Sequence, residues 1–264
     1  MWIDTHCHLD AHEFGDESSS IAERAAHQGV SWIVIPAVDR TNFGTVAMLA
    51  NGQGNCAYAL GIHPICVPQA QEEDLAALRK AVAAALSDPR FVAIGEIGLD
   101  FFIPALCGDA MREKQEHFYG EQLKIARDFD LPVLLHVRRS QDRVLKYLRR
   151  VAVPGGIAHA FNGSFQQAQA FLELGFKLGF GGAMTFPRAL QIRRLAHELD
   201  ESAIVLETDA PDISPAWLHP ARNSPDELPR IGEVLAELRG MPVEAVAQFT
   251  SGNARSVLPR LGGL

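Results

Sequence analysis

Six residues of this sequence carry side chains that commonly bind divalent metals, and each lies near the end of a short apolar segment. Imidazole nitrogens combined with carboxylate oxygens suit zinc and manganese, and suit magnesium less naturally. Six ligands shared by two ions would leave coordination positions for water and substrate, which is typical of a catalytic site. We therefore predict a site for two divalent metal ions. The predicted ligands are His6, His8, Glu96, His136, His159 and Asp209.

His6 and His8 are separated by a single residue and follow the apolar start of the chain. On an extended strand, residues i and i+2 lie on the same face, so both imidazoles would point toward one ion. Cys7 would point to the opposite face, where we expect it to pack in the interior rather than bind metal.

The remaining ligands are assigned to ions from the order of the strands. The eighth strand of a closed barrel neighbours the first, so Asp209 can reach the ion held by the first two histidines. His136 and His159 end the fifth and sixth strands and can share a second ion. Glu96 ends the fourth strand, from which its carboxylate could bridge both ions.

Other polar residues near the same ends have two open interpretations. His63 is expected to contact substrate or to orient a metal ligand, with metal ligation itself as the alternative. Arg138 and Arg139 follow His136 and could hold an anionic substrate group, or they could be the solvated start of a basic helix; Arg222 has the same two interpretations. Glu207 would either orient a metal ligand or fill the barrel with a buried hydrogen bond. The other histidines, expected on the surface, are His12, His27, His117, His197 and His219.

Short apolar segments alternate with helical patterns along the whole chain. Strands are predicted at residues 2–6, 32–36, 57–61, 91–96, 132–136, 156–160, 176–180 and 204–207. Helices are predicted at residues 18–29, 72–86, 113–129, 142–150, 165–174, 188–199, 228–238 and 242–249. Eight strand–helix units predict a parallel sheet closed into a (β/α)8 TIM barrel, and nothing divides residues 1–264 into more than one domain. Active sites of such barrels lie at the C-terminal ends of the strands, which is where the predicted ligands fall.

Composition and charge narrow the function classes. The chain has 264 residues, a hydrophobic fraction of 47% and a net charge of -8. Such an acidic protein lacks the field of a non-specific nucleic-acid binder, so bound metal would have to supply the local positive charge. The four cysteines form no CxxC pair, and the chain begins with no signal-peptide pattern and contains no apolar run of about 20 residues. We expect a cytoplasmic protein with no membrane segment and no obligate protein partner.

The motifs around these residues resemble the TatD-type metal-dependent deoxyribonucleases, a branch of the amidohydrolase-like barrel hydrolases. The matching segments, in the order of that family and spread over nearly the whole chain, are IDTHCHLD (3–10), GIHP (61–64), GEIGLD (95–100), PVLLH (132–136), HAFNG (159–163), LETDAP (206–211) and NAR (253–255).

The resemblance implies the two-metal ligand set given above, with Glu96 shared by both ions. It places His63 and Arg222 on the substrate side and implies DNA as the substrate. Phe101 and Phe102 stand where the family often has tyrosine, and the loop at 212–225 lacks a glycine-lysine stretch before its asparagine. Both differences lie where substrate is expected, so they bear on substrate preference more than on the chemistry.

The predicted reaction is hydrolysis of phosphodiester bonds at an end of single-stranded DNA by a metal-activated water. Asp209 and Glu96 are the predicted catalytic residues, and Asp209 would orient the water and accept its proton. One alternative is hydrolysis of an ester, amide or lactone, including an ester at a nucleic-acid 3′ end. Many such enzymes bridge their metals with a carboxylated lysine, so a glutamate in that place favours the nuclease. A second alternative is a metal-binding barrel without catalysis, whose coordination shells would be filled.

Overall fold

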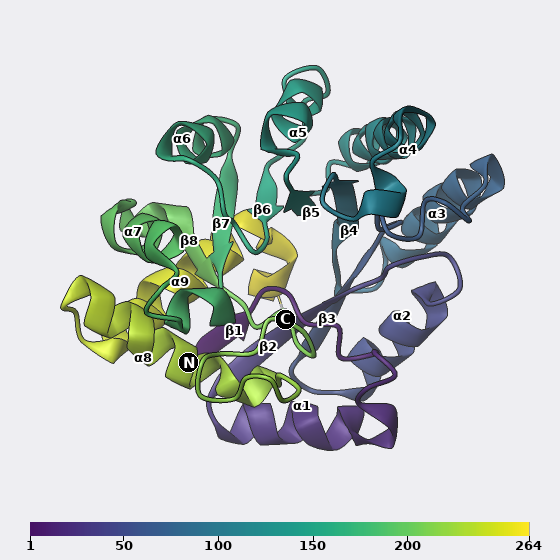
Figure 1. Ribbon diagram of the computed structural model, residues 1–264. Helices are drawn as coiled ribbons and strands as arrows, with labels where there is room; N and C mark the ends of the chain where they lie inside the picture. The colour runs from purple at the N-terminus through teal and green to yellow at the C-terminus, as the bar shows by residue number, and fades with distance from the viewer. Residues whose placement is uncertain (264) are drawn as a thin grey trace.

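The computed structural model describes residues 1–263, which form an eight-stranded parallel sheet with helices around it (Figure 1). The strands, hydrogen-bonded in sequence order, are β1 Trp2–Asp4, β2 Val30–Pro36, β3 Cys56–Leu60, β4 Phe91–Asp100, β5 Val133–Arg138, β6 Gly156–Ala158, β7 Phe176–Phe180 and β8 Ile204–Leu206. The α-helices are α1 Ser18–His27, α2 Phe43–Gly52, α3 Glu72–Ala85, α4 Asp109–Asp128, α5 Gln141–Leu148, α6 Phe165–Glu173, α7 Leu190–Glu198, α8 Leu228–Arg239 and α9 Val243–Val257. Short 3-10 helices lie at η1 Gly15–Glu17, η2 Pro104–Leu106, η3 Gly182–Thr185, η4 Glu201–Ala203, η5 Pro225–Glu227 and η6 Pro259–Gly263.

The ends of β8 and β1 lie together and close the sheet into the predicted (β/α)8 barrel. The Thr5 amide donates to the Leu206 carbonyl at 3.1 Å, and beyond the strand ends the Asp209 amide donates to the His6 carbonyl at 2.8 Å. The segment after β8 is thereby held against the segment after β1. This closure brings residues some 200 positions apart in the sequence to the same rim.

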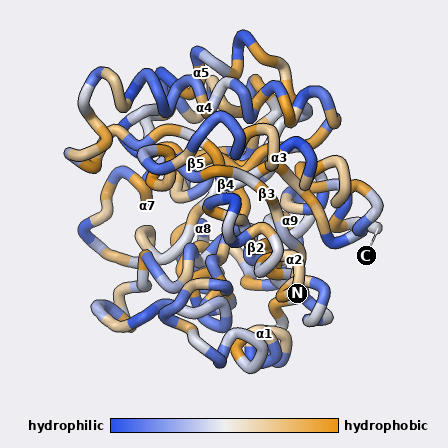
Figure 2. The backbone as a smooth tube through the Cα atoms, turned by 90° about the vertical axis from the view of Figure 1, so that its right-hand side faces the viewer, coloured by the Kyte–Doolittle hydropathy of each residue, from blue (hydrophilic) through white to orange (hydrophobic). Residues whose placement is uncertain are grey.

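The core consists of an outer layer between strands and helices and a smaller cluster inside the barrel. Figure 2 shows hydrophobic residues concentrated in the strands and hydrophilic ones on the outer helices and loops. Interior positions carry compact side chains such as Val34, Ala59 and Leu134, in contact with Val257 of α9 and Leu261 of η6. Because α9 and η6 cover the N-terminal ends of the strands, the open face of the barrel is the one at their C-terminal ends.

All eight predicted strands are present, with bounds that differ by a few residues. β4 is four residues longer than predicted and continues to Asp100. β1 ends at Asp4, so the prediction that His6 and His8 lie on a strand is wrong. These histidines follow the strand, and the backbone contacts with the segment after β8 hold them there.

Two helices differ from prediction. Helix α2 was not predicted, because Phe43–Gly52 contains glycines and threonine, shows no polar stripe, and leaves its apolar Met48 71% exposed. Helix α9 was predicted to end at 249 but continues to Val257. The Thr250 hydroxyl donates to the Val246 carbonyl within the helix, and the Ser251 hydroxyl donates to the Met1 carbonyl at the start of the chain, so both buried hydroxyls have hydrogen-bond partners. No helix within residues 1–263 is long and apolar enough to cross a bilayer.

Candidate metal centre

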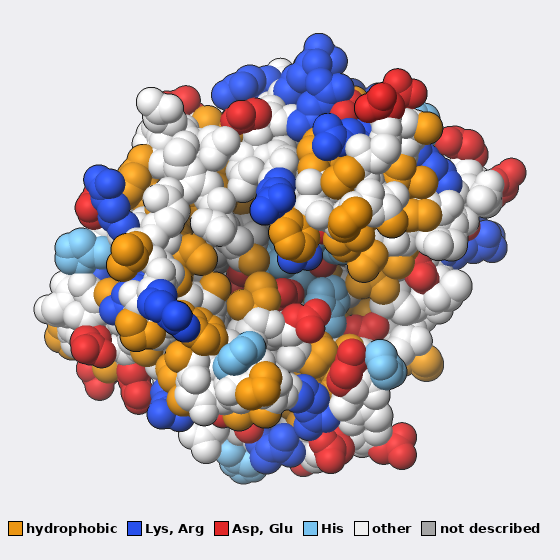
Figure 3. All heavy atoms as spheres, viewed as in Figure 1, with side chains coloured by type: hydrophobic (Ala, Val, Ile, Leu, Met, Phe, Trp, Pro, Cys, Tyr) orange, Lys and Arg blue, Asp and Glu red, His pale blue; other side chains and the backbone are white. Residues whose placement is uncertain are grey.

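Five of the six predicted metal ligands line a pocket of about 1110 Å³ at the open face of the barrel, and the sixth, His6, is fully buried directly beside them, 3.1 Å from Glu96. Figure 3 shows a central hollow on this face, with acidic and histidine side chains in its depth and hydrophobic side chains on its rim. The remaining histidines (His12, His27, His117, His197 and His219) are exposed, as predicted. Cys7 is fully buried in the core, which confirms its predicted packing role, and all four cysteines are free thiols.

Glu96 lies at the centre of the cluster and is 1% exposed. Its Oε2 is 3.1 Å from Nε2 of His6 and 3.3 Å from Nε2 of His8. Its Oε1 is 2.9 Å from Nδ1 of His136 and 2.8 Å from Nε2 of His159. The two oxygens of one carboxylate therefore face two groups of donors, which adjoin where the rings of His6 and His159 stack with their centres 4.0 Å apart.

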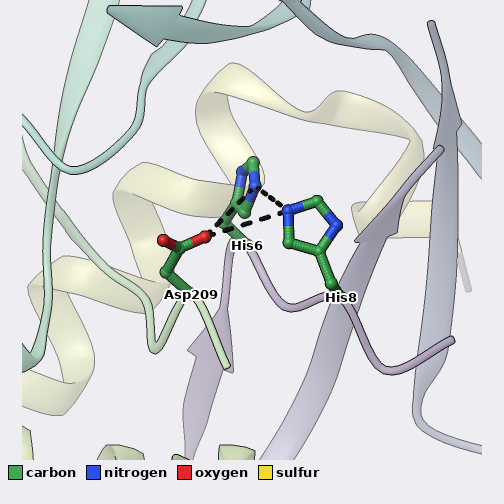
Figure 4. A group of neighbouring side chains, drawn as sticks. All are labelled: His6, His8 and Asp209. Carbon is green, nitrogen blue, oxygen red and sulfur yellow. Dashed lines mark hydrogen bonds and ion pairs between the residues drawn. The ribbon is translucent and has the colours of Figure 1, made fainter. Parts of the chain in front are cut away.

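The first donor group consists of His6, His8 and Asp209, together with Oε2 of Glu96 (Figure 4). The Nε2 atoms of the two histidines are 3.3 Å apart, and Oδ1 of Asp209 lies 3.6 Å from His6 and 3.9 Å from His8. The close-up shows the three side chains pointing toward one another from the segments after β1 and β8.

The second donor group surrounds Oε1 of Glu96 and contains three histidines. His136 lies within β5, His159 directly follows β6, and His63 lies in the segment after β3. The Nδ1 of His136 lies 3.4 Å from Nε2 of His159 and 3.1 Å from Nε2 of His63. His63, predicted on the substrate side, thus lies directly beside this donor group.

The geometry and chemistry of these residues fit divalent metal. Nitrogen ligands about 2.0–2.1 Å from a tetrahedral ion lie roughly 3.3–3.4 Å from one another, close to the spacing of both groups. Among the described residues, every ion-pair partner of Glu96 is a histidine. A buried carboxylate surrounded by imidazoles requires either protonated rings or a bound cation.

The charge balance supports the same conclusion. Burial lowers the pKa of His6 to about 3 and that of His63 to about 4. Burial opposes charge on His8 and His159 too, but the Glu96 carboxylate outweighs it and raises their pKa to about 9 and about 10. The carboxylates thus attract positive charge to this pocket, and a divalent ion can supply it while every imidazole stays neutral.

Buried acids behind the donor groups hold them in place. Asp4 accepts hydrogen bonds from the Thr208 amide at 3.0 Å, the Thr208 hydroxyl at 2.6 Å and the His6 amide at 3.2 Å. It therefore connects the segments that carry His6 and Asp209. Sequence reasoning assigned Asp4 no role, although it stands two residues before the first histidine.

Asp100 and Glu207 lie behind the second donor group. Oδ2 of Asp100 lies 3.0 Å from Nε2 of His136. Oε1 of Glu207 accepts from the Ala160 amide at 2.5 Å and lies 3.7 Å from Nδ1 of His159. Burial raises the pKa of Glu207 to about 8. Asp100 lies within a segment singled out from the sequence, but the strand pattern indicated nothing about which histidine it would meet.

The two candidate substrate arginine sites lie in different places. Arg138 and Arg139 line the pocket that contains the donor groups. Arg222 lines an adjoining hollow with Phe186. Its guanidinium donates to Oε2 of Glu17 at 2.8 Å and to the Glu13 carbonyl. Among the described residues, Arg222 is the one predicted site residue that does not lie at the cluster.

A parallel barrel with histidine and carboxylate donors clustered at the C-terminal ends of its strands is the architecture of the metal-dependent hydrolases. The family model described as TatD related DNase matches residues 3–259, so the chain belongs to the TatD family.

Individual relatives agree with this membership. The chain is 40% identical over 254 residues to the "Uncharacterized metal-dependent hydrolase YjjV" of Escherichia coli, covering 96% of this chain and 95% of the relative. The crystal structure of that TatD homolog superposes with a TM-score of 0.91 at 38% identity, covering 98% of both chains. The chain is also 30% identical over 263 residues to the "3'-5' ssDNA/RNA exonuclease TatD" of Erwinia billingiae, covering 97% of this chain and 98% of the relative.

Proposed function

We propose that this protein is a two-metal phosphodiesterase that removes nucleotides from an end of single-stranded DNA. The observation that carries the proposal is that the two carboxylate oxygens of Glu96 face different donor groups, Oε2 the first and Oε1 the second. Two-metal sites stabilise the attacking and leaving oxygens of phosphodiester hydrolysis in many nucleases. A relative 30% identical over nearly its full length is named as an ssDNA/RNA exonuclease, which supports this substrate.

Each ion has its own set of protein ligands. The first would be held by His6, His8 and Asp209 together with Oε2 of Glu96. The second would be held by His136, His159 and Oε1 of Glu96, which leaves a position for substrate. His63 lines the pocket beside this second group, and we assign it to substrate, so that the second ion with its three protein ligands keeps an open position. Bound ions would supply Lewis acidity at the pocket floor and make a water there more acidic.

The chain's own residues complete the reaction. Asp209 lines the pocket and lies within 3.9 Å of both His8 and His159, so its carboxylate can orient the attacking water and accept its proton. Arg138 and Arg139 at the rim would hold phosphate groups of the strand that the acidic protein would otherwise repel.

The test is cleavage of end-labelled single-stranded DNA by metal-stripped protein, with zinc, manganese or magnesium added back in turn. His6→Ala should lack the restored activity, whereas His12→Ala, whose side chain is 92% exposed, should retain it. Stoichiometric metal binding with no shortening of DNA or RNA would refute the nuclease.

A second candidate keeps the metal centre and changes the bond to a small ester, amide or lactone. The 40% identical relative is named only as a metal-dependent hydrolase, which is consistent with either bond. Simple esters, amides and lactones assayed beside the oligonucleotide separate the two candidates.

A further inference from the structure

Phe102, Arg138 and Arg139 form a small aromatic and cationic surface at the pocket rim, which we call the Phe102 platform. We propose that this platform binds the nucleotide next to the scissile bond, with the base stacked on the Phe102 ring and the phosphates held by the two arginines. The inference rests on the proposed nuclease function and adds to it which part of the substrate is recognised.

The platform is open to solvent and composed of groups that bind nucleotides. Phe102 is 41% exposed, and Cζ of Arg138 and Cζ of Arg139 lie over its ring, 3.9 Å and 4.6 Å from the ring centre. A base would stack on the ring in place of a guanidinium group, which would turn to the phosphates. All three residues line the pocket that holds the donor groups. Phe101, the residue before Phe102, packs against the core instead, and Cζ of Arg112 lies 4.7 Å from the centre of its ring. The chain therefore turns one phenylalanine inward and leaves the next at the rim.

The position of the platform is fixed relative to the metal centre through Asp100. Oδ1 of Asp100 accepts from the amides of Phe102 at 2.8 Å and Ile103 at 3.0 Å. Oδ2 of the same carboxylate lies 3.0 Å from Nε2 of His136 and 3.9 Å from Nη1 of Arg138. One buried side chain thus connects the platform to a predicted metal ligand. A group bound on the platform would lie beside the second donor group.

The chemistry of the platform matches a nucleotide end better than a small ester. Stacking on an aromatic ring is tolerant of sequence, since every base has a π face. Arginine guanidinium groups bind phosphate through paired hydrogen bonds and stack on planar groups. With a net charge of -8, the protein needs such local cations to hold a polyanion near its acidic centre.

The first test measures selectivity. Wild type should prefer an oligonucleotide with a normal terminal nucleotide over one that is abasic at that position. Phe102→Leu, which keeps apolar bulk but removes the ring, should reduce this preference about tenfold, mainly through KM. Phe102→Tyr should restore it. Phe129→Leu is the matched control, because Phe129 also lies near an arginine (Arg79, 5.6 Å) but does not line the pocket.

The second test does not depend on turnover. A phosphorothioate oligonucleotide with 2-aminopurine at its terminal nucleotide, bound to metal-loaded protein, should lose fluorescence on stacking. Phe102→Leu should abolish this quenching, and Phe129→Leu should retain it. Equal quenching in wild type and Phe102→Leu, or none in wild type, would overturn the platform. Failure of the nuclease itself would be seen separately, as no cleavage of either oligonucleotide by wild type.

Discussion

Oδ2 of Asp100 lies 3.0 Å from Nε2 of His136, on the side of the ring opposite the Nδ1 atom that faces Glu96. An ionised carboxylate can only accept a hydrogen bond, so it holds the proton of His136 on Nε2. That tautomer leaves the Nδ1 lone pair free for a metal ion. The pair therefore determines which nitrogen of His136 is available to the second donor group.

Asp100→Asn should weaken metal binding in the second donor group about 10- to 100-fold. An asparagine amide turned toward Nε2 would donate, which favours the tautomer with the proton on Nδ1. The measurement is competition for metal between protein and a chromophoric chelator, with turnover in parallel. Asp142→Asn, on the exposed side of α5, is the control. Unchanged affinity in both ion-binding steps would show that Asp100 does not orient His136.

Asp209→Asn should reduce kcat by several orders of magnitude while the protein stays folded. The amide cannot accept the proton of the attacking water, but it preserves the size of the side chain. The checks are the rate of DNA cleavage and the thermal unfolding midpoint by circular dichroism. An active variant with bound metal would remove Asp209 from its assigned role.

His63→Ala distinguishes a substrate contact from a metal ligand. Because His63 is assigned to substrate, KM should rise and the metal content should remain at the wild-type value. Metal content by atomic emission, together with kcat and KM, checks this expectation. A loss of one ion per chain would instead place His63 among the ligands of the second group.

The ion pair between Glu116 and Arg143 should make the stability of the protein depend on pH in the acid range. Arg143 donates to both carboxylate oxygens of Glu116 at 2.6 Å, and the Tyr147 hydroxyl donates at 2.9 Å. Burial alone would raise the pKa of Glu116, but these hydrogen bonds outweigh it and hold the pKa below its usual value. The folded state therefore favours the ionised carboxylate. This contribution is present above the unfolded pKa of about 4.3 and is lost as pH falls through the lower folded value.

Glu116→Gln should accordingly lower the free energy of unfolding at pH 7 by about 1 kcal/mol, a modest value because Arg143 is partly exposed. The difference from wild type should shrink as the pH falls below about 4. Urea unfolding at several pH values measures it. Glu198→Gln, which breaks only the exposed pair with Arg194, should show little effect at any pH. A difference that stays constant down to pH 3 would contradict the role of the Glu116 charge.

The pattern of apolar segments alone predicted all eight strands, and the ends of those strands indicated the residues that the structure brings together around Glu96. These predictions succeed because they depend on local rules. Buried parallel strands are continuous apolar runs, and the ends of such strands meet at one face of a barrel. Helix α2 was not predicted by the same rules, because its apolar Met48 faces solvent and the polar residues of the helix form no stripe.

Tertiary structure decided the contacts between residues distant in sequence. The approach of Asp4 to Thr208, the contact of His63 with His136 and the pairing of Arg222 with Glu17 each depend on how separate loops settle on the closed barrel. Residue types and spacing carry no information about such distances. The sequence therefore determined which chemical groups reach the open face, and the packing of the loops determined which partner each of them meets there.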